Sequence, residues 1–202
     1  MAALATLLAV ALVLVGACGS EEEETGPPTA GPRPSQTATS GPGPASEPAP
    51  TVDPGIPLVA FRSPDKGYSL RYPEGWEVDA TPGGGTDAFL WRIGDRRLAL
   101  LQVTCNRELL TPQSLMRADA SVASNLGGYL NLADAVPMQV GGVEGKQNRY
   151  SLSVGGLTIE HVVAYVAIGD CGWRIGLNSY GTGSLNPYLP LFDRILASFH
   201  FD

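Results

Sequence analysis

Histidine and cysteine are scarce in this sequence, which limits the metal and redox chemistry that it can support. The 202 residues include two histidines, His161 and His200, and three cysteines. A zinc site needs ligand pairs at short spacings, with members about three to five positions apart. Neither histidine has such neighbours. We therefore expect no metal site and no cofactor.

Motifs that mark common enzyme classes are also absent. The sequence has no Gly-x-Ser-x-Gly, His-Glu-x-x-His, Gly-x-x-x-x-Gly-Lys-Ser/Thr or Cys-x-x-Cys motif. Glu160-His161 is the only adjacent acid and imidazole, and its alternating context favours a cross-strand or surface pair over a general-base dyad. No helix follows Gly83 to Gly85, so this segment is interpreted as a mobile hairpin loop rather than a phosphate cradle. We predict no catalytic residue and a protein that is not an enzyme.

The N-terminal segment has no charged residue before Cys18, although signal peptides usually begin with Lys or Arg. Every residue from Ala2 to Ala17 is Ala, Leu, Val, Thr or Gly. This run is shorter than the roughly 20 residues that cross a bilayer. It therefore predicts a cleaved signal peptide, residues 1–17, rather than a span. The missing positive charge leaves open a longer N-terminus in which the same segment would be a transmembrane helix.

The segment ends in Val15-Gly16-Ala17-Cys18, which resembles a lipobox. The signal peptidase for lipoproteins cleaves after small residues, and the cysteine thiol takes a diacylglyceryl group. The resemblance implies that Cys18 is the first mature residue and the lipidation site, with palmitate among the acyl groups. The chain would then be anchored to the membrane at the outer face of the cytoplasmic membrane or in the cell envelope.

Residues 18–57 form an acidic and then Pro-rich segment. Glu21 to Glu24 are four consecutive carboxylates, and ten of the 32 residues from Gly26 to Pro57 are proline. Such a segment buries too little apolar surface to fold, so we expect a disordered tether rather than a ligand for a Pro-binding domain. The remaining residues, 58–202, carry 12 basic and 14 acidic side chains. This balance gives no indication of nucleic acid binding.

Cys105 and Cys171 are the cysteines of the 145-residue domain that follows the tether. Each lies at the end of a predicted strand. If the signal peptide is real, the domain is in an oxidising compartment, where a disulfide is favoured over two free thiols. We therefore predict a Cys105–Cys171 bond, with two free thiols as the alternative.

Alternating apolar residues predict strands through most of the domain. Tyr68, Leu70 and Tyr72 alternate with polar residues, and Pro73-Glu74-Gly75 turns the chain before Trp76. The Gly155-Gly156 pair supplies the positive φ angles of a tight hairpin turn. Further strands are predicted at 88–93, 98–105, 146–154, 157–167 and 171–179.

Two helices interrupt the predicted strands. Thr111 is a good N-cap before Pro112, and an apolar face then continues to Leu126. A shorter helix follows Asn186-Pro187, with its regular part after Pro190. Helices packed on the faces of a mostly antiparallel β-sheet predict an α+β fold.

The run Gly67-Tyr68-Ser69-Leu70-Arg71-Tyr72-Pro73-Glu74-Gly75-Trp76, with the later hairpins, long helix and closing Ser198-Phe199, resembles the superfamily of PsbP and the Ran-binding Mog proteins. With the lipobox and tether, the chain is similar to the LpqN and LpqT type of actinobacterial lipoproteins. The resemblance extends from about Ala60 to Asp202 and implies a flanked-sheet αβα sandwich with an accessory, non-catalytic role. The family-signature residues are expected to be structural: Tyr68, Tyr72, Pro73, Gly75 and Trp76.

Two classes of function remain. The first is an adaptor or accessory module that binds an envelope protein complex. The second is a carrier that holds a lipid or small apolar ligand between sheet and helix. The apolar residues are already accounted for by ordinary core faces, which favours the adaptor.

Overall fold

The computed structural model describes Asp53 and residues 55–202. The predicted signal peptide, Cys18 and nearly all of the predicted tether lie outside these residues. The described elements run in this order: β1 (Leu58–Arg62), β2 (Tyr68–Pro73), β3 (Glu77–Asp79), β4 (Thr86–Ile93), β5 (Arg96–Asn106), α1 (Pro112–Asn125), β6 (Leu130–Val140), β7 (Val143–Val154), β8 (Leu157–Ile168), β9 (Cys171–Tyr180), the 3-10 helix η2 (Asn186–Tyr188), α2 (Leu189–Ala197) and β10 (His200–Phe201).

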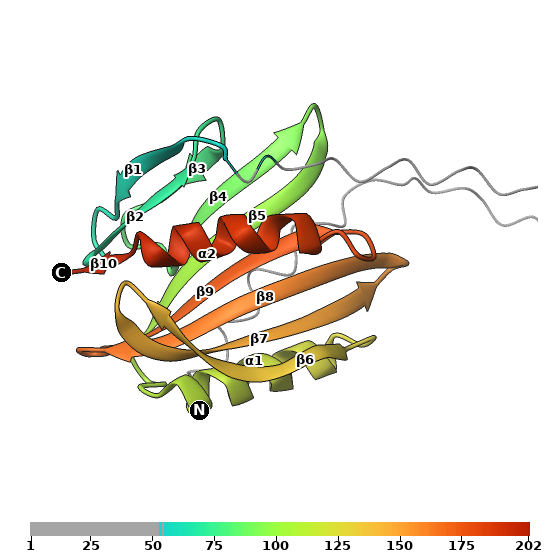
Figure 1. Cartoon of the computed structure of the whole chain (residues 1–202). Helices are drawn as coiled ribbons and strands as arrows, with labels where there is room; N and C mark the ends of the chain where they lie inside the picture. The colour runs from blue at the N-terminus through green and yellow to red at the C-terminus, as the bar shows by residue number, and fades with distance from the viewer. Residues whose placement is uncertain (1–52, 54) are drawn as a thin grey trace, which may run out of the picture. The chain divides into compact units, whose positions relative to one another are not determined.

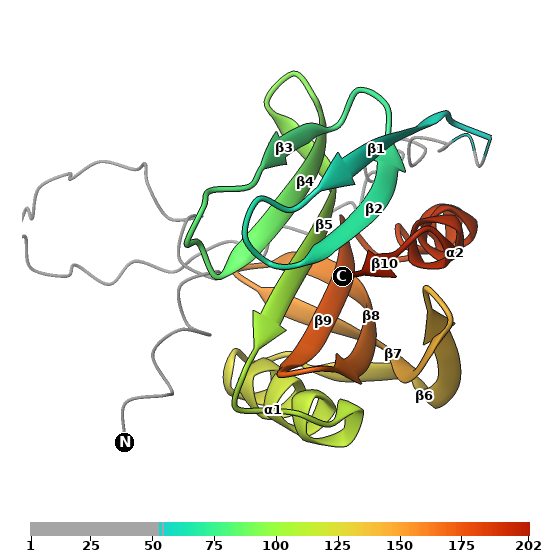
Figure 2. The same ribbon diagram turned by 90° about the vertical axis from the view of Figure 1, so that its left-hand side faces the viewer.

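The strands form two antiparallel sheets. The larger sheet has the order β3-β4-β5-β9-β8-β7-β6, and the smaller has the order β1-β2-β10. In Figure 1, α2 lies above the larger sheet and α1 lies beneath it, so the helices cover opposite faces. Figure 2 shows the small sheet beside α2, over the face that α1 does not cover. The α+β prediction is confirmed, although the sequence did not indicate that a second sheet would separate from the first.

The main core lies between the larger sheet, α2 and the smaller sheet. Period-two alternation on β8 and β9 directs one set of side chains to this face, because successive strand residues point to opposite sides. The fully buried members include Val162 and Ala164 of β8, with Ile175 and Leu177 of β9. Helix α2 contributes four buried side chains to the same cluster: Leu191, Phe192, Ile195 and Leu196.

Helix α1 begins as predicted. Thr111 is the N-cap, and its hydroxyl accepts a hydrogen bond from the Ser114 backbone N–H at 3.0 Å. The inward face differs from the expectation, because Asp119 is buried whereas Leu126 is 39% exposed. An acidic residue therefore lies under the helix, where the sequence pattern favoured only apolar packing.

Five strands of the larger sheet, β4, β5, β7, β8 and β9, follow the predicted boundaries within three residues. Gly155 and Gly156 adopt φ angles of 58° and 80°, in the left-handed region that a tight turn requires. Pro190 lies in the first turn of α2 rather than before it, where its missing N–H has no helical partner to lose.

Candidate functional site

An open pocket lies at the end of the larger sheet where β5 ends and β9 begins. Its volume is about 470 Å³. Its lining includes Lys66 from the β1–β2 turn, the Gly83–Gly85 loop, Arg107, and Trp173 of β9, together with both cysteines of the domain. We call it the disulfide-end pocket. It is bordered by charged side chains on several turns, so it differs from a closed apolar cavity.

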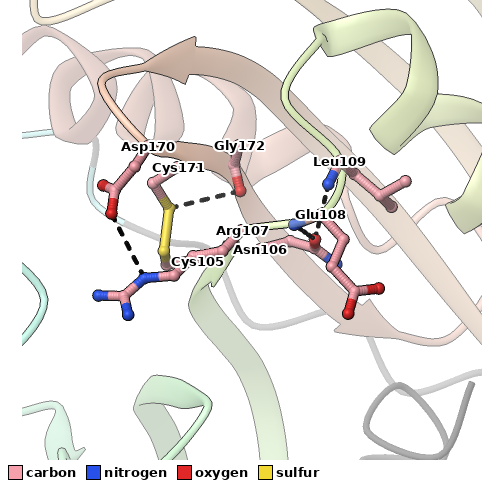
Figure 3. The surroundings of a disulfide bond; sticks show 8 residues. All are labelled: Cys105, Asn106, Arg107, Glu108, Leu109, Asp170, Cys171 and Gly172. Carbon is pink, nitrogen blue, oxygen red and sulfur yellow. Dashed lines mark hydrogen bonds and ion pairs between the residues drawn. A yellow bond between two sulfur atoms is a disulfide. The ribbon is translucent and has the colours of Figure 1, made fainter. Parts of the chain in front are cut away.

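Both cysteines line this pocket, and Figure 3 shows the disulfide that joins them. The Sγ atoms of Cys105 and Cys171 are bonded at 2.07 Å, and their Cα atoms lie 5.6 Å apart. Antiparallel register sets this contact, since Cys105 pairs with Trp173 across β5 and β9, close to the first residue of β9. The predicted bond is therefore present in the structure.

The chain turns sharply beyond the disulfide. Asn106 Oδ1 accepts hydrogen bonds from the backbone N–H groups of Glu108 at 2.8 Å and Leu109 at 2.9 Å (Figure 3). Arg107 then projects at the pocket rim, with its Nε 3.7 Å from Asp170 Oδ2. Both side chains of this pair are largely exposed. Water screens such a pair, so Arg107 and Asp170 remain available to a binding partner.

A buried ionic cluster lies behind the pocket. Asp87 is fully buried and accepts hydrogen bonds from Ser63 Oγ at 2.7 Å, Tyr68 OH at 2.7 Å and Lys66 Nζ at 2.8 Å. Burial by itself would lower the pKa of Lys66, but its bonds to Asp87 and Asp65 outweigh that effect and raise the pKa. Burial and the neighbouring Asp87 also raise the pKa of the Tyr68 hydroxyl. The cluster therefore keeps Lys66 charged and Tyr68 protonated, and it fastens the β1–β2 turn to β4.

The Gly83–Gly85 segment connects β3 to β4 beside this cluster. Gly83 has a φ of 75°, and its backbone N–H donates to Asp65 Oδ2 at 2.5 Å. A Cβ on Gly84 would lie 2.8 Å from the Thr81 carbonyl oxygen. The loop thus lies on the pocket wall in a conformation that its glycines allow.

Trp173 carries an unpaired donor beside the pocket. Its ring is 3% exposed and packs against Tyr68 and Phe201, with centroid separations of 5.3 Å and 5.4 Å. The indole Nε1 is buried and has no hydrogen-bond acceptor among the described residues. A buried donor without an acceptor is costly, and because this atom is enclosed it is not presented to the open pocket.

A second polar cluster lies between α1 and the larger sheet. Asp119 Oδ1 accepts a hydrogen bond from Arg174 Nε at 2.9 Å, while Oδ2 accepts from Tyr165 OH at 2.6 Å and Tyr150 OH at 3.0 Å. Burial would raise the pKa of Asp119, but the Arg174 charge and these three bonds hold it below its usual value. Gly176 leaves room for the guanidinium, because a Cβ there would lie 2.8 Å from Arg174 Nη1. Every carboxylate oxygen is engaged, so we interpret this cluster as structural.

Glu160 and His161 do not form a dyad, because adjacent strand residues point to opposite faces. Glu160 accepts hydrogen bonds from the backbone N–H groups of Gly183 at 2.6 Å and Leu185 at 3.0 Å, and so holds the loop before α2. His161 stacks on Tyr150 with centroids 4.6 Å apart, and neither ring nitrogen has a hydrogen-bond partner. Burial, with a smaller effect from the Arg174 charge, lowers the pKa of His161 to about 4. The expected surface position is therefore wrong, because both side chains are buried, whereas His161 does form a cross-strand pair, with Tyr150 of β7.

The signature residues occupy the corner between β2 and β3. Trp76 is buried and stacks on Trp91, whereas Tyr72 is half-buried with its ring 5.0 Å from that of Phe89. Gly75 turns the chain with a φ of 84°. Pro73 is the buried last residue of β2. These positions are consistent with structural roles.

Other residues considered from the sequence stand apart from the pocket wall. His200 is exposed on β10 and has no hydrogen-bond partner among the described residues. Within residues 53 and 55–202, no three His, Cys, Asp or Glu side chains are grouped as a metal site would need. In that same part of the chain, no helix combines the length and apolar character needed to span a membrane.

Comparison with known proteins gives matches of structure only. No family model matches the chain, and no curated protein sequence matches it. The Ran-binding protein Mog1p of Saccharomyces cerevisiae is similar, with a TM-score of 0.53, 11% identity and coverage of 72% of this chain and 96% of Mog1p. The cyanobacterial PsbP of Synechocystis sp. PCC 6803 is similar, with a TM-score of 0.50, 20% identity and coverage of 81% of this chain and 99% of that one.

LpqN of Mycobacterium tuberculosis, described as involved in cell envelope biogenesis, is also similar. Its TM-score is 0.46 with 15% identity, and the match covers 72% of this chain and 90% of LpqN. At these identities a structural likeness establishes the fold and nothing about activity. The described part of the chain therefore has the α+β fold that PsbP and Mog1p share.

Proposed function

We propose that the domain is a non-catalytic adaptor or accessory module of a lipid-anchored lipoprotein outside the cytoplasmic membrane, and that it binds an envelope protein. The observation that carries this proposal is the filled interior. The space between α2 and the two sheets is occupied by buried apolar side chains. The large hollow among the described residues is instead the open, charged disulfide-end pocket.

A carrier would need a different interior. Apolar ligands are usually enclosed by apolar side chains in a cavity of about 300 to 1,000 Å³. The disulfide-end pocket reaches that size, but Asp65, Lys66, Arg107 and Asp170 border it. A second hollow of about 270 Å³ between α1 and β6 is smaller and open. These features favour a protein segment over an apolar ligand as the occupant.

The pocket offers a partner both charged and hydrogen-bonding groups. Arg107 and Asp170 at the rim can form new ion pairs and hydrogen bonds with a partner. A peptide supplies carbonyl acceptors and side chains of either charge. The proposed contact is therefore between this pocket and an exposed loop or terminus of an envelope protein.

The non-catalytic part of the proposal rests on the histidines and on the ionic clusters. His161 is buried with no nucleophile in hydrogen-bonding reach of its ring nitrogens. Asp87 and Asp119 are each engaged by three surrounding groups. Groups held in this way stabilise a fold more readily than they transfer protons.

A photocrosslinking residue placed at Arg107 tests the proposal in intact cells. Arg107 has a largely exposed side chain at the pocket rim, so replacing it leaves the core unchanged. We expect a crosslink to one envelope protein, and its loss when Cys18→Ser removes the anchor. Ser121, exposed on the outer side of α1, is the matched control position and should give no such product.

Three outcomes would contradict the adaptor. A lipid adduct at Arg107 would support the carrier instead. Equal crosslinking at Arg107 and Ser121 would mean that the pocket has no special role. A crosslink that survives Cys18→Ser unchanged would show that the anchor does not place the domain beside its partner.

A further inference from the structure

Half of the large exposed apolar side chains gather at one end of the domain. Five of the ten lie on or beside turns at the end of the larger sheet opposite the disulfide, and the others are Val78, Leu110, Leu132, Val136 and Ile168. Each of the five at this end exposes more than a third of its surface, so each can contact a partner: Ile93 61%, Leu126 39%, Leu130 60%, Val154 45% and Leu157 41%. We call these five residues and their turns the apolar end. Scattered exposed leucines are ordinary, whereas a cluster indicates an interaction surface.

Strand register places these turns at one end. Val154 pairs with Leu157 across the β7–β8 turn, and Leu130 pairs with Ser151 of β7. Close contact between Gly128 and Ser153 joins the end of α1 to the same turn. The β4–β5 turn, which carries Ile93, belongs to this end because β5, β9 and β8 alternate in direction. In Figure 1 the β4–β5 and β7–β8 turns both lie toward the right-hand side.

The composition of the turns distinguishes this end from the pocket end. Residues 126–132, 153–158 and 180–185 contain no charged side chain. The β4–β5 turn adds Arg92, Arg96 and Arg97 against Asp95, and Glu77 of the neighbouring β3 binds the Arg92 guanidinium. The apolar end is therefore uncharged apart from one turn with an excess of positive charge. The turns of the opposite end, in contrast, carry Asp65, Lys66, Arg107, Glu108 and Asp170.

The chain enters the domain on the side nearer the apolar end. Tyr68 OH lies 2.7 Å from Asp87 Oδ2, the Tyr72 ring 5.0 Å from Phe89, and the Trp76 ring 6.4 Å from Trp91. From β2 onward the chain thus runs beside β4 toward the β4–β5 turn. Because Leu58 pairs with Pro73, the first residue of β1 lies toward that same turn. The sequence preceding this entry point includes the apolar segment that ends at Cys18.

We propose that the apolar end docks on an anionic lipid bilayer, with Ile93, Leu130, Val154 and Leu157 inserting into the interfacial region. Apolar side chains on separate turns suit a plane better than a groove, and neighbouring strands about 5 Å apart spread these turns across the sheet end. Even with Arg92 bound to Glu77, the β4–β5 turn keeps a net positive charge beside Ile93, which complements anionic headgroups. The inference rests on the proposed anchor for proximity to the membrane, while the docking contact itself comes from the domain.

Tethering determines how strong this contact must be. Between Cys18 and Ile56 the chain could extend to roughly 130 Å, so the anchor alone does not hold the domain at the surface. Attachment to the same membrane raises the local concentration of the surface for the domain. A weak contact through a few side chains is therefore sufficient to orient it, with the disulfide-end pocket turned away from the lipid.

Depth-dependent quenching in vesicles tests the docking. The full chain with Val154→Cys is labelled at that position with an environment-sensitive fluorophore. The labelled protein is then bound to vesicles of phosphatidylcholine and phosphatidylglycerol whose acyl chains are brominated. Cys105 and Cys171 are bonded, and Cys18 is replaced by serine where it carries no lipid, so the new thiol is the one that is labelled. We expect strong lipid quenching at position 154 and none for the same label at Leu110→Cys, a 47% exposed position near the disulfide end.

Matched substitutions identify the residues responsible. In the Val154→Cys background, the double substitution Ile93→Asp with Leu157→Asp should lower the affinity of the domain for the vesicles. Each change removes one inserted side chain and should lower that affinity roughly tenfold. Val78→Asp with Leu110→Asp, two exposed apolar residues away from the apolar end, should leave the quenching unchanged. Vesicles without phosphatidylglycerol should give weaker quenching of the label at position 154.

Equal quenching at positions 154 and 110 would overturn the docking proposal. A label at 154 that is shielded from aqueous iodide but unaffected by brominated lipid, and that crosslinks to protein, would show that a protein covers the apolar end instead. Fatty-acid labelling of the same preparation reports separately on Cys18. An unmodified Cys18 would contradict the anchor, while the comparison of the two labelled positions would still decide the docking.

Discussion

His161 shows how burial changes the chemistry of one side chain. Its ring stacks on Tyr150 of β7 and faces Arg174 of β9 and Asp119 of α1. Burial and the Arg174 charge lower its pKa from 6.5 to about 4, and the Asp119 carboxylate only partly opposes them. The neutral imidazole is therefore the form that the folded domain accommodates.

This lowered pKa predicts a pH dependence of stability. Between pH 6.5 and about 4 the unfolded chain binds a proton at His161 while the folded chain does not, so stability from this group is complete above pH 6.5 and is lost as the pH falls. The loss amounts to about 3 kcal/mol. Urea unfolding across this range should show it, and His161→Gln should remove that part of the slope. His200→Gln, at an exposed position, is the control; an equal effect there would contradict the account.

Residue-scale contacts were only partly predictable from the sequence. Tyr68 belongs to the family-resembling run from Gly67 to Trp76, but its partner Asp87 comes from another strand, and no sequence signal pairs the two. Asp119 lies on the buried Leu115, Asp119, Ala123 stripe of α1, but the apolar pattern from Leu115 to Leu126 did not place this carboxylate inward. Its partner Arg174 depends on the register of β9, which the sequence does not specify.

At the scale of elements, the disulfide joins the end of β5 to the start of β9 across a sequence separation of 66 residues. That interval contains α1, β6, β7 and β8. The bond therefore restrains most of the larger sheet in the unfolded chain, where it reduces the conformational entropy.

Removal of the bond gives a prediction for these elements. Cys105→Ala with Cys171→Ala should lower the free energy of unfolding by about 4 kcal/mol in the loop-entropy model. Guanidinium unfolding of oxidised wild-type and variant protein measures the difference. The variant should keep its far-ultraviolet circular dichroism, since the strand ladders do not require the bond. A difference near zero, or two thiols alkylated in native oxidised protein, would contradict the assignment.

Elements with regular periodicity were predicted well, and irregular ones were missed. The β7 to β9 meander was located because alternation and glycine turns coincide there. Strand β6 was not, because register shifts between Asn131 and Val136 break its alternation and Pro137 interrupts it. Strand β1 is short and directly follows Pro57, so its apolar run merged with the Pro-rich segment. Strand β10 has two residues, which is too short for an alternating pattern that the sequence could show.

On the scale of the whole molecule, the two ends of the larger sheet differ in chemistry. One end has exposed apolar side chains on turns that carry no charge apart from the β4–β5 turn, and the other has the disulfide and the charged pocket. The proposed roles follow this difference, with lipid at the first end and an envelope protein at the second. Both roles depend on a chain held at the membrane.

The attachment of lipid to Cys18 is the measurement that tests this account most directly. Cells expressing the chain would be fed an alkyne fatty acid, and the protein would be assayed for label and for membrane association, with Cys18→Ser in parallel. The account predicts label on the wild-type chain, none on Cys18→Ser, and a shift of the variant out of the membrane fraction. Unlabelled wild-type protein, or a variant still fully retained in the membrane, would contradict it and would indicate that Ala2 to Val15 is a permanent span.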